Sequence, residues 1–209
     1  NPFTENRTSY FHKSIGGNNP AKLRRYQDLI ERHLSKNNEK VLHMLNAKYA
    51  IISPDQPPQL MPGALGNAWF VREIKKVQNP DDEIAALDNF EPAYTAVVDV
   101  SKFKIGSDKF DSSTASITLK TCTPKYLQYV SKSPSEKLAV FSEIYYPKGW
   151  NAYIDGQLKE HASVNYVLRG LTIPAGKHKI EFKFEPVTYT NGNNIATIGS
   201  ILLIITIGT

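Results

Sequence analysis

The sequence predicts an α+β fold, with a small helical N-terminal region and a C-terminal antiparallel β-sandwich of the jelly-roll or immunoglobulin-like kind. Apolar residues recur at helical spacing over residues 20–35, and seven short strand-like runs follow from about residue 93, separated by turn-forming residues. We therefore divide the chain into a mixed α/β region over residues 1–92, a β-sandwich over residues 93–190, and a distinct C-terminal segment over residues 195–209.

The composition excludes several classes of protein. A chain of 209 residues with 41% hydrophobic and 22% charged residues is neither disordered nor collagen-like nor fully embedded in a membrane. The single cysteine, Cys122, excludes an intrachain disulfide and a zinc site built on several thiolates. The net charge of +5 is modest and the basic residues are dispersed, so we expect no nucleic-acid partner.

An amphipathic helix is predicted over residues 20–35. Asn19 is a preferred N-cap residue, and Pro20 suits the first helical position because no helical partner is needed for its missing N–H group. The apolar side chains at helical spacing are Leu23, Tyr26, Ile30 and Leu34. We expect the basic residues Lys22, Arg24, Arg25 and Arg32 on a solvated face, with contact to an anionic lipid or substrate as the alternative.

Short helices and strands alternate through the middle of the chain. Four prolines within residues 54–62 predict a loop, and Asn79-Pro80-Asp81-Asp82 predicts the capped start of a short helix that runs through Leu87. The helix dipole favours the acidic cluster Asp81-Asp82-Glu83 at this position. The remaining elements expected here are a helix over residues 39–45 and strands over residues 48–53 and 67–77.

The C-terminal half carries the strand pattern. Asp155-Gly156 predicts a tight hairpin, and residues 178–184 alternate apolar and charged side chains, which predicts a sheet with one solvated face. The seven expected strands cover residues 94–99, 115–122, 126–131, 137–145, 150–154, 166–172 and 178–184.

No motif of a known catalytic or metal site is recognisable. The chain lacks G-x-S-x-G, H-E-x-x-H and P-loop patterns, and its five histidines do not stand at metal-ligand spacing, so we expect no metal and no cofactor. A soluble glycoside hydrolase would need two carboxylates in a cleft, for which Asp99, Glu143 and Asp155 are the candidates near predicted strand ends.

Aromatic residues gather near the predicted hairpin. Tyr145, Tyr146, Trp150 and Tyr153 fall within nine residues and precede Asp155. Aromatic rings take the C–H face of a sugar while a carboxylate binds its hydroxyls, so these residues could form a sugar platform. The alternative is that Trp150 is a core residue of the sandwich.

The last fifteen residues, 195–209, are apolar or uncharged. A membrane helix needs about 20 residues of this kind, so we expect the start of a truncated transmembrane helix, with a buried strand as the alternative. Residues 187–194 contain no lysine or arginine, whereas cytoplasmic flanks are usually rich in both. The folded part is therefore expected on the outer side of the membrane.

Several blocks of the sequence resemble the YfhO family of polytopic bacterial membrane proteins, which has many members in Bacteroidetes. The strongest is Phe141-Ser-Glu-Ile-Tyr-Tyr-Pro-Lys-Gly-Trp150 followed by Asn-Ala-Tyr-Ile-Asp155-Gly156. The sequence departs from the family pattern after Gly17, where Asn18-Asn19-Pro20 replaces an aromatic-containing segment. The other blocks cover residues 8–17, 21–26, 44–49, 66–71, 165–170 and 173–178.

The resemblance implies a function. The family looks like the GT-C class of glycosyltransferases, whose catalytic carboxylate lies in an early extracytoplasmic loop between membrane helices and whose donor is a polyprenyl-phosphate sugar. Neither that loop nor those helices are in this sequence, so no catalytic residue carries over. We expect a non-catalytic domain on the periplasmic or extracellular side of the bacterial inner membrane, working in cell-surface glycan assembly.

Such a domain would bind or orient a glycan or a lipid-linked sugar, and its other partner would be the remainder of its own membrane domain. The candidate ligand-binding residues are Tyr146, Trp150, Tyr153, Asp155 and Arg169. Two alternatives stay open. The domain could be a purely structural or interaction module that braces the membrane part, or it could be a soluble glycoside hydrolase.

Overall fold

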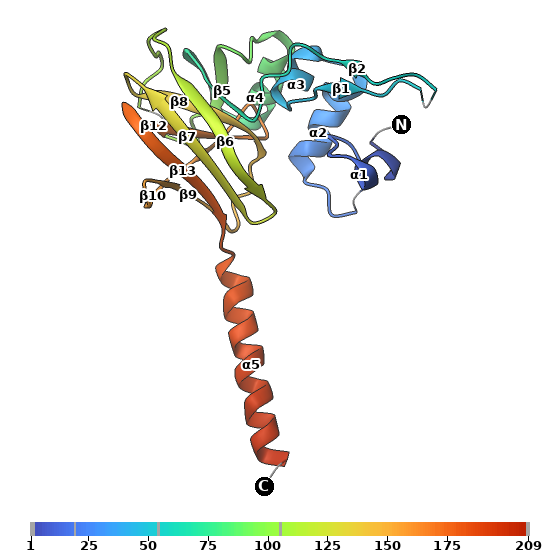
Figure 1. The fold of residues 1–209 in the computed structure, drawn as a ribbon, viewed down its shortest axis with the longest axis vertical. Helices are drawn as coiled ribbons and strands as arrows, with labels where there is room; N and C mark the ends of the chain where they lie inside the picture. Colours follow the sequence, from blue (N-terminus) through green and yellow to red (C-terminus); the bar gives the residue numbers. More distant parts are fainter. Residues whose placement is uncertain (1–2, 19, 54, 105, 208–209) are drawn as a thin grey trace.

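The computed structural model describes residues 3–18, 20–53, 55–104 and 106–207. Figure 1 shows a globular part built from sheets and short helices, from which one long helix, α5 (Val187–Ile207), projects alone. The mixture of helices with antiparallel sheets confirms the predicted α+β class.

Two antiparallel sheets form the sandwich. The first has the strand order β10-β9-β13-β7-β6, and the second has the order β11-β12-β8-β3. The strands of the first sheet are β6 (Ser116–Thr123), β7 (Tyr126–Ser133), β9 (Trp150–Ile154), β10 (Gln157–Lys159) and β13 (Gly176–Phe184). Those of the second are β3 (Ala68–Phe70), β8 (Lys137–Ile144), β11 (Ala162–Val164) and β12 (Leu168–Ile173).

Short helices and two small sheets make up the N-terminal region. The helices are α1 (Arg7–Phe11), α2 (Arg24–Arg32), η1 (Leu34–Lys36), α3 (Glu39–Met44), α4 (Pro80–Ala86) and η2 (Leu87–Asn89). One small sheet pairs β1 (Tyr49–Ala50) with β2 (Gln59–Leu60), and the other pairs β4 (Glu73–Val77) with β5 (Thr95–Asp99) in parallel.

The four-stranded sheet is the middle of three layers. On β8, Ala139 and Phe141 face the core between the two sheets, whereas Leu138 and Val140 face a second core on the other side. That second core includes Leu29 of α2 and residues of α4 and β5. Because both faces are covered, β8 has five consecutive buried residues instead of the alternation of a half-exposed strand.

The first long helix is shorter than its sequence pattern predicts. Helix α2 begins at Arg24, Leu23 is its N-cap, and Pro20 lies in a turn. The residues before Arg24 follow the N-terminal segment instead, where the Lys22 amine donates to the Phe3 carbonyl at 3.4 Å. The predicted cap Asn19 lies outside the described residues. The predicted helix starting after Asn79 is confirmed, and the Asn79 side chain accepts from Asp82 N–H.

Sheet membership differs from the prediction in two places. The strand predicted over residues 67–77 is two strands, β3 and β4, which belong to different sheets. The strand predicted over residues 94–99, β5, pairs with β4 rather than entering the sandwich. Every residue of β5 is buried, and Ala96, Val97 and Val98 belong to the second core, whereas β4 is mostly exposed and contributes Ile74 to that core. Residues on both sides of the predicted boundary at 92–93 therefore contribute to one core. The predicted hairpin at Asp155-Gly156 is confirmed, because β10 pairs antiparallel with β9 across this turn. The sequence pattern missed β11 and also β2, which lies in the predicted loop over residues 54–62.

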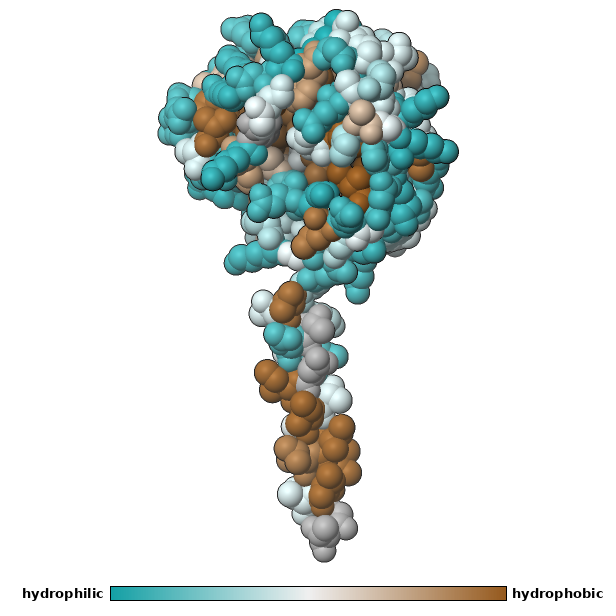
Figure 2. Space-filling view, turned by 90° about the vertical axis from the view of Figure 1, so that its left-hand side faces the viewer, coloured by the Kyte–Doolittle hydropathy of each residue, from teal (hydrophilic) through white to brown (hydrophobic). Residues whose placement is uncertain are grey.

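Helix α5 begins at Val187, ahead of the predicted start at Ile195, because uncharged polar residues extend the helix toward the sandwich. Among the described residues it is the one helix that is long and apolar enough to cross a membrane, with 21 residues or about 30 Å. Figure 2 shows apolar side chains along the far part of α5, whereas the globular part is mostly hydrophilic on this face. The last two residues of the predicted segment, 208–209, lie outside the described residues.

Gly149 joins the sandwich to the start of α5. Its φ of +110° is in the region that favours glycine, and an added Cβ would lie 2.9 Å from Phe184 Cε2 and 3.1 Å from Pro186 Cβ. Its carbonyl also accepts from Glu185 N–H. The chain is therefore tightly packed at Gly149, Phe184 and Pro186, just before α5 begins.

We expect Gly149→Ala to lower the free energy of unfolding by about 1–3 kcal/mol, from backbone strain and this steric conflict. Amide hydrogen exchange at residues 185–189 should accelerate as the junction loosens. Gly106→Ala is the matched control, because its added Cβ would meet open space and its φ is not in that strained region. Equal stability and exchange in both variants would contradict a rigid junction.

Candidate functional site

The end of the sandwich next to α5 gathers an unusual set of side chains. Strand β13 ends at Phe184, three residues before α5 begins. The Trp150 ring, at the start of β9, packs on Phe184 with 5.4 Å between the ring centroids. We call this region the α5-proximal end. It lies closer to α5 than any other part of the two sheets, because β13 and β9 pair there at Phe184 and Trp150.

Arg169 is buried at this end. It is 3% exposed, and its guanidinium carbon lies 4.2 Å from the centroid of the Trp150 ring and 5.2 Å from that of Phe182. Its Nε donates to the Ile144 carbonyl at 3.1 Å, where a register shift between β12 and β8 brings that carbonyl within reach. Burial lowers the pKa of Arg169 to about 10, with Glu143 and Tyr129 opposing the change.

Three further titratable side chains surround Arg169. Burial raises the pKa of Glu143, although Arg169 opposes the rise. Burial lowers the pKa of His161 to about 4, and the positive charge of Arg169 adds to the effect. Tyr129 is fully buried, which raises the pKa of its hydroxyl. Several strongly perturbed groups in one place are typical of functional sites, although buried structural networks show them as well.

An open pocket lies on the other side of Ile144. We call it the N-terminal pocket, and its volume is about 590 Å³. Its apolar wall comes from Ile15, Tyr26, Ile30 and Ile144. Polar groups around it come from Asn6, Ser9, Ser14, Asn18 and Lys22. The Ile144 side chain lines this pocket while its carbonyl accepts from Arg169, so the pocket and the buried cluster share one residue.

The N-terminal segment is folded around the pocket by a few hydrogen bonds. The Tyr26 hydroxyl donates to the Ile15 carbonyl, and Asn18 N–H donates to the Asn6 side-chain oxygen at 2.6 Å. Gly17 has a φ of +129°, and an added Cβ would lie 3.2 Å from Ser9 Oγ, so glycine is required at this bend. These contacts bring α1 and the start of α2 together as one wall.

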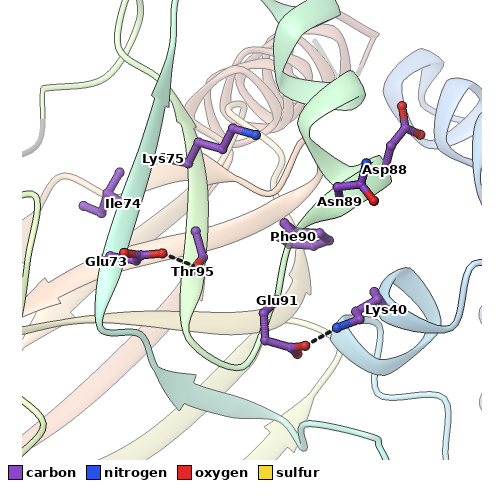
Figure 3. Close-up of a pocket in the computed structure, with 9 residues that line it drawn as sticks. All are labelled: Lys40, Glu73, Ile74, Lys75, Asp88, Asn89, Phe90, Glu91 and Thr95. Atoms are coloured by element: carbon purple, nitrogen blue, oxygen red, sulfur yellow. Dashed lines mark hydrogen bonds and ion pairs between the residues drawn. The ribbon is translucent and has the colours of Figure 1, made fainter.

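A second hollow of about 710 Å³ lies between α3, η2 and the β4–β5 pair (Figure 3). Its lining includes Lys40, Glu73, Asp88 and Glu91. These groups already have partners, since Lys40 pairs with Glu91, Glu73 accepts from the Thr95 hydroxyl at 2.8 Å, and Asp88 pairs with Arg32 at 2.7 Å. Lys75 on β4 is the remaining charged lining residue, so four of the five charged groups that line the hollow are already paired.

The structure brings together two of the five predicted ligand-binding residues, Trp150 and Arg169. Tyr153 lies on the opposite face of β9, where its hydroxyl donates to Glu185 at 2.7 Å. Asp155 lies in the hairpin turn, 2.6 Å from His178 Nδ1. Tyr146 follows β8 and is half-buried.

The carboxylates considered for a hydrolase lie apart. Asp99 ends β5 and accepts from Ser101, Glu143 lies on β8 beside its register shift with β12, and Asp155 pairs with His178. None of the three lines either of the two hollows. Within the described part of the chain, no group of three or more His, Cys, Asp or Glu side chains could hold a metal ion.

Sequence reasoning missed Tyr129, His161 and the N-terminal pocket. One signal was available for Tyr129, because it shares the inward face of β7 with Leu127 and places a hydroxyl among apolar groups. The approach of His161 to this cluster depends on how the chain returns after β10, and no local pattern encodes that path.

The comparisons with known proteins agree with one part of the sequence analysis. The family described as bacterial membrane protein YfhO matches residues 98–196, from the end of β5 to the first half of α5. This match confirms the resemblance indicated by the sequence blocks across the sandwich. No curated protein and no solved structure matches the chain.

Proposed function

We propose that this chain is the extracytoplasmic domain of a multi-span YfhO-family membrane protein, and that it binds or orients a glycan or a lipid-linked sugar. The domain itself would not catalyse transfer. The family match and α5 support attachment to a membrane, and the lack of lysine and arginine in residues 187–194 supports an outer location.

The N-terminal pocket carries the binding proposal. Its volume lies within the range of about 300–1,000 Å³ that is typical of ligand pockets, and its wall combines apolar side chains with a few polar groups. A sugar has the same two characters, because its ring C–H groups suit the apolar wall and its hydroxyls suit Ser9, Ser14 and Asn18. The Lys22 ammonium adds a positive charge that favours a phosphate.

The position of the pocket favours a ligand held in a membrane. Ile144 connects it to Arg169, Arg169 contacts Trp150, and Trp150 packs on Phe184, three residues before α5 begins. A sugar carried on a polyprenyl phosphate stays at the membrane surface, whereas a soluble glycan does not. We therefore favour the lipid-linked sugar over the soluble glycan as the ligand.

The test is a titration of the whole 209-residue chain in lipid nanodiscs with polyprenyl-phosphate sugars, the free sugars and polyprenyl phosphate alone. Ser9→Trp would fill the pocket, and we expect it to weaken binding at least about tenfold, equivalent to about 1.4 kcal/mol. Thr8→Trp is the matched control on the same helix, because Thr8 is exposed and does not line the pocket. Absence of glycan binding by the folded chain would overturn the proposal.

A purely structural role is the second candidate, and the packing of Trp150 favours it. The Trp150 side chain packs against the sandwich core and contacts Arg169 and Phe184, as expected of a residue that closes the core. A bracing module predicts that Trp150→Ala lowers stability while neither the original chain nor Thr8→Trp binds any of the ligands above.

A further inference from the structure

Three polar side chains converge on one aromatic ring inside the sandwich. The Arg169 guanidinium carbon lies 5.2 Å from the centroid of Phe182, and the His161 ring centroid lies 5.6 Å from it. The Tyr129 ring centroid lies 6.3 Å from the same point. The three residues come from β12, from the segment before β11 and from β7, so the tertiary fold places them together.

Each of these side chains holds a buried polar atom that lacks a hydrogen-bond partner in the described part of the chain. The atoms are Arg169 Nη1, His161 Nε2 and Tyr129 Oη. Buried polar atoms in native proteins are almost always satisfied by protein or by ordered water. Three such atoms around one ring indicate that they share one hydrogen-bond partner, rather than each remaining without a hydrogen bond.

Glu143 supplies a fourth polar group. It lies on β8 at the register shift opposite Arg169. The two groups influence each other, since Arg169 opposes the rise in the pKa of Glu143. Burial raises the pKa of Tyr129 most, and Glu143 adds to that rise.

We propose that an ordered internal water molecule binds at the α5-proximal end of the sandwich core and bridges Arg169 Nη1, Tyr129 Oη, His161 Nε2 and the Glu143 carboxylate. The donors and acceptors match a single water. Arg169 and Tyr129 donate to its oxygen, and its two hydrogens go to Glu143 and to the lone pair of a neutral His161.

Other small ligands fit this set of groups less well. A bound anion would meet the Glu143 carboxylate, and a bound cation would meet the Arg169 guanidinium. Water carries no net charge and both donates and accepts, so it satisfies all four groups without a new charge. The bridge would hold Arg169 in place under Ile144, whose side chain lines the N-terminal pocket.

The test is a crystal structure of the whole chain in detergent at a resolution that shows ordered water. We expect a density peak within hydrogen-bonding distance of Arg169 Nη1 and of at least two of the other three groups. A direct Arg169–Glu143 ion pair that fills the space, or a dry core, would overturn the proposal.

A measurement in solution makes the test independent of crystals. Nuclear Overhauser effects from water to the His161 and Tyr129 rings should be present in the original chain and weaker in Tyr129→Phe. Tyr126→Phe is the matched control, because it lies on the same strand but its hydroxyl donates to Glu181 outside the core. Equal signals in all three proteins would count against a bound water.

Discussion

Replacing Glu83 by alanine is expected to lower the free energy of unfolding by about 3–5 kcal/mol, because it removes one partner of a buried ion pair. The Glu83 side chain is fully buried and pairs through Oε2 with Arg25, whose side chain is 32% exposed. Its other oxygen accepts from Tyr166 N–H at 3.0 Å. The variant would therefore leave both a guanidinium and a buried backbone donor without their partner.

The effect should be large because this network joins three separate elements. Arg25 on α2 lies 4.2 Å from the centroid of the Tyr166 ring, and the Tyr166 hydroxyl donates to Asp28 at 3.0 Å. Glu83 belongs to α4, and Tyr166 belongs to the turn between β11 and β12. Tyr166 has a φ of +71° and Asn165 one of +49°, a backbone conformation that costs energy and needs outside support.

Urea unfolding of the whole chain measures this effect, and Glu83→Gln separates charge from hydrogen bonding. The glutamine keeps an oxygen acceptor for Tyr166 N–H, so we expect it to be less destabilising than alanine. Asp88→Ala is the surface control, because its pair with Arg32 is half-exposed and such pairs contribute about 0–1 kcal/mol. A loss in Glu83→Ala no greater than that in Asp88→Ala would show that the network does not hold the layers together.

The sequence could predict part of this region. The sequence predicts Asp81-Asp82-Glu83 at a helix start, and the structure confirms that all three lie in the first turn of α4. The pattern did not show that Glu83 turns inward to Arg25, 58 residues away, and it predicts a solvated face for that arginine. Helical periodicity and capping depend on neighbours in sequence, whereas a buried ion pair depends on how α2 packs against α4.

In the same way, the sequence predicts individual strands better than it predicts which strands pair in a sheet. Most strands of the C-terminal half were found, because apolar runs and turn residues are local signals. The pairing of β5 with β4, and the exit of β3 into the sandwich, depend on which edges meet in space. At the site, Trp150 was found from a local cluster of aromatic residues, whereas its contact with Arg169 depends on β9 and β12 facing each other across the core.

Replacing Arg169 by alanine is the second change with a large expected effect, a loss of about 2–5 kcal/mol of stability from the cavity alone. The guanidinium lies against the Trp150 and Phe182 rings, and its Nε donates to the partly buried Ile144 carbonyl. Arg169→Met keeps much of the buried stem and should recover part of this loss. Arg169→Lys should not restore it fully, because a compact ammonium cannot cover both rings and reach the same carbonyl.

The Arg169→Met variant should also become sensitive to rising pH through Glu143. The pKa of Glu143 is already raised from 4.5 by burial, and Arg169 opposes that rise, so removing the guanidinium should raise it further. A carboxyl whose pKa is higher in the folded state favours folding in its neutral form, and this advantage is lost as the pH rises through the folded-state pKa. Urea midpoints measured from pH 4 to 8 should therefore fall more steeply in Arg169→Met than in the original chain. Adding Glu143→Gln to Arg169→Met should make the urea midpoint less dependent on pH again. A double variant as pH-sensitive as Arg169→Met would show that Glu143 is not the group whose pKa Arg169 lowers.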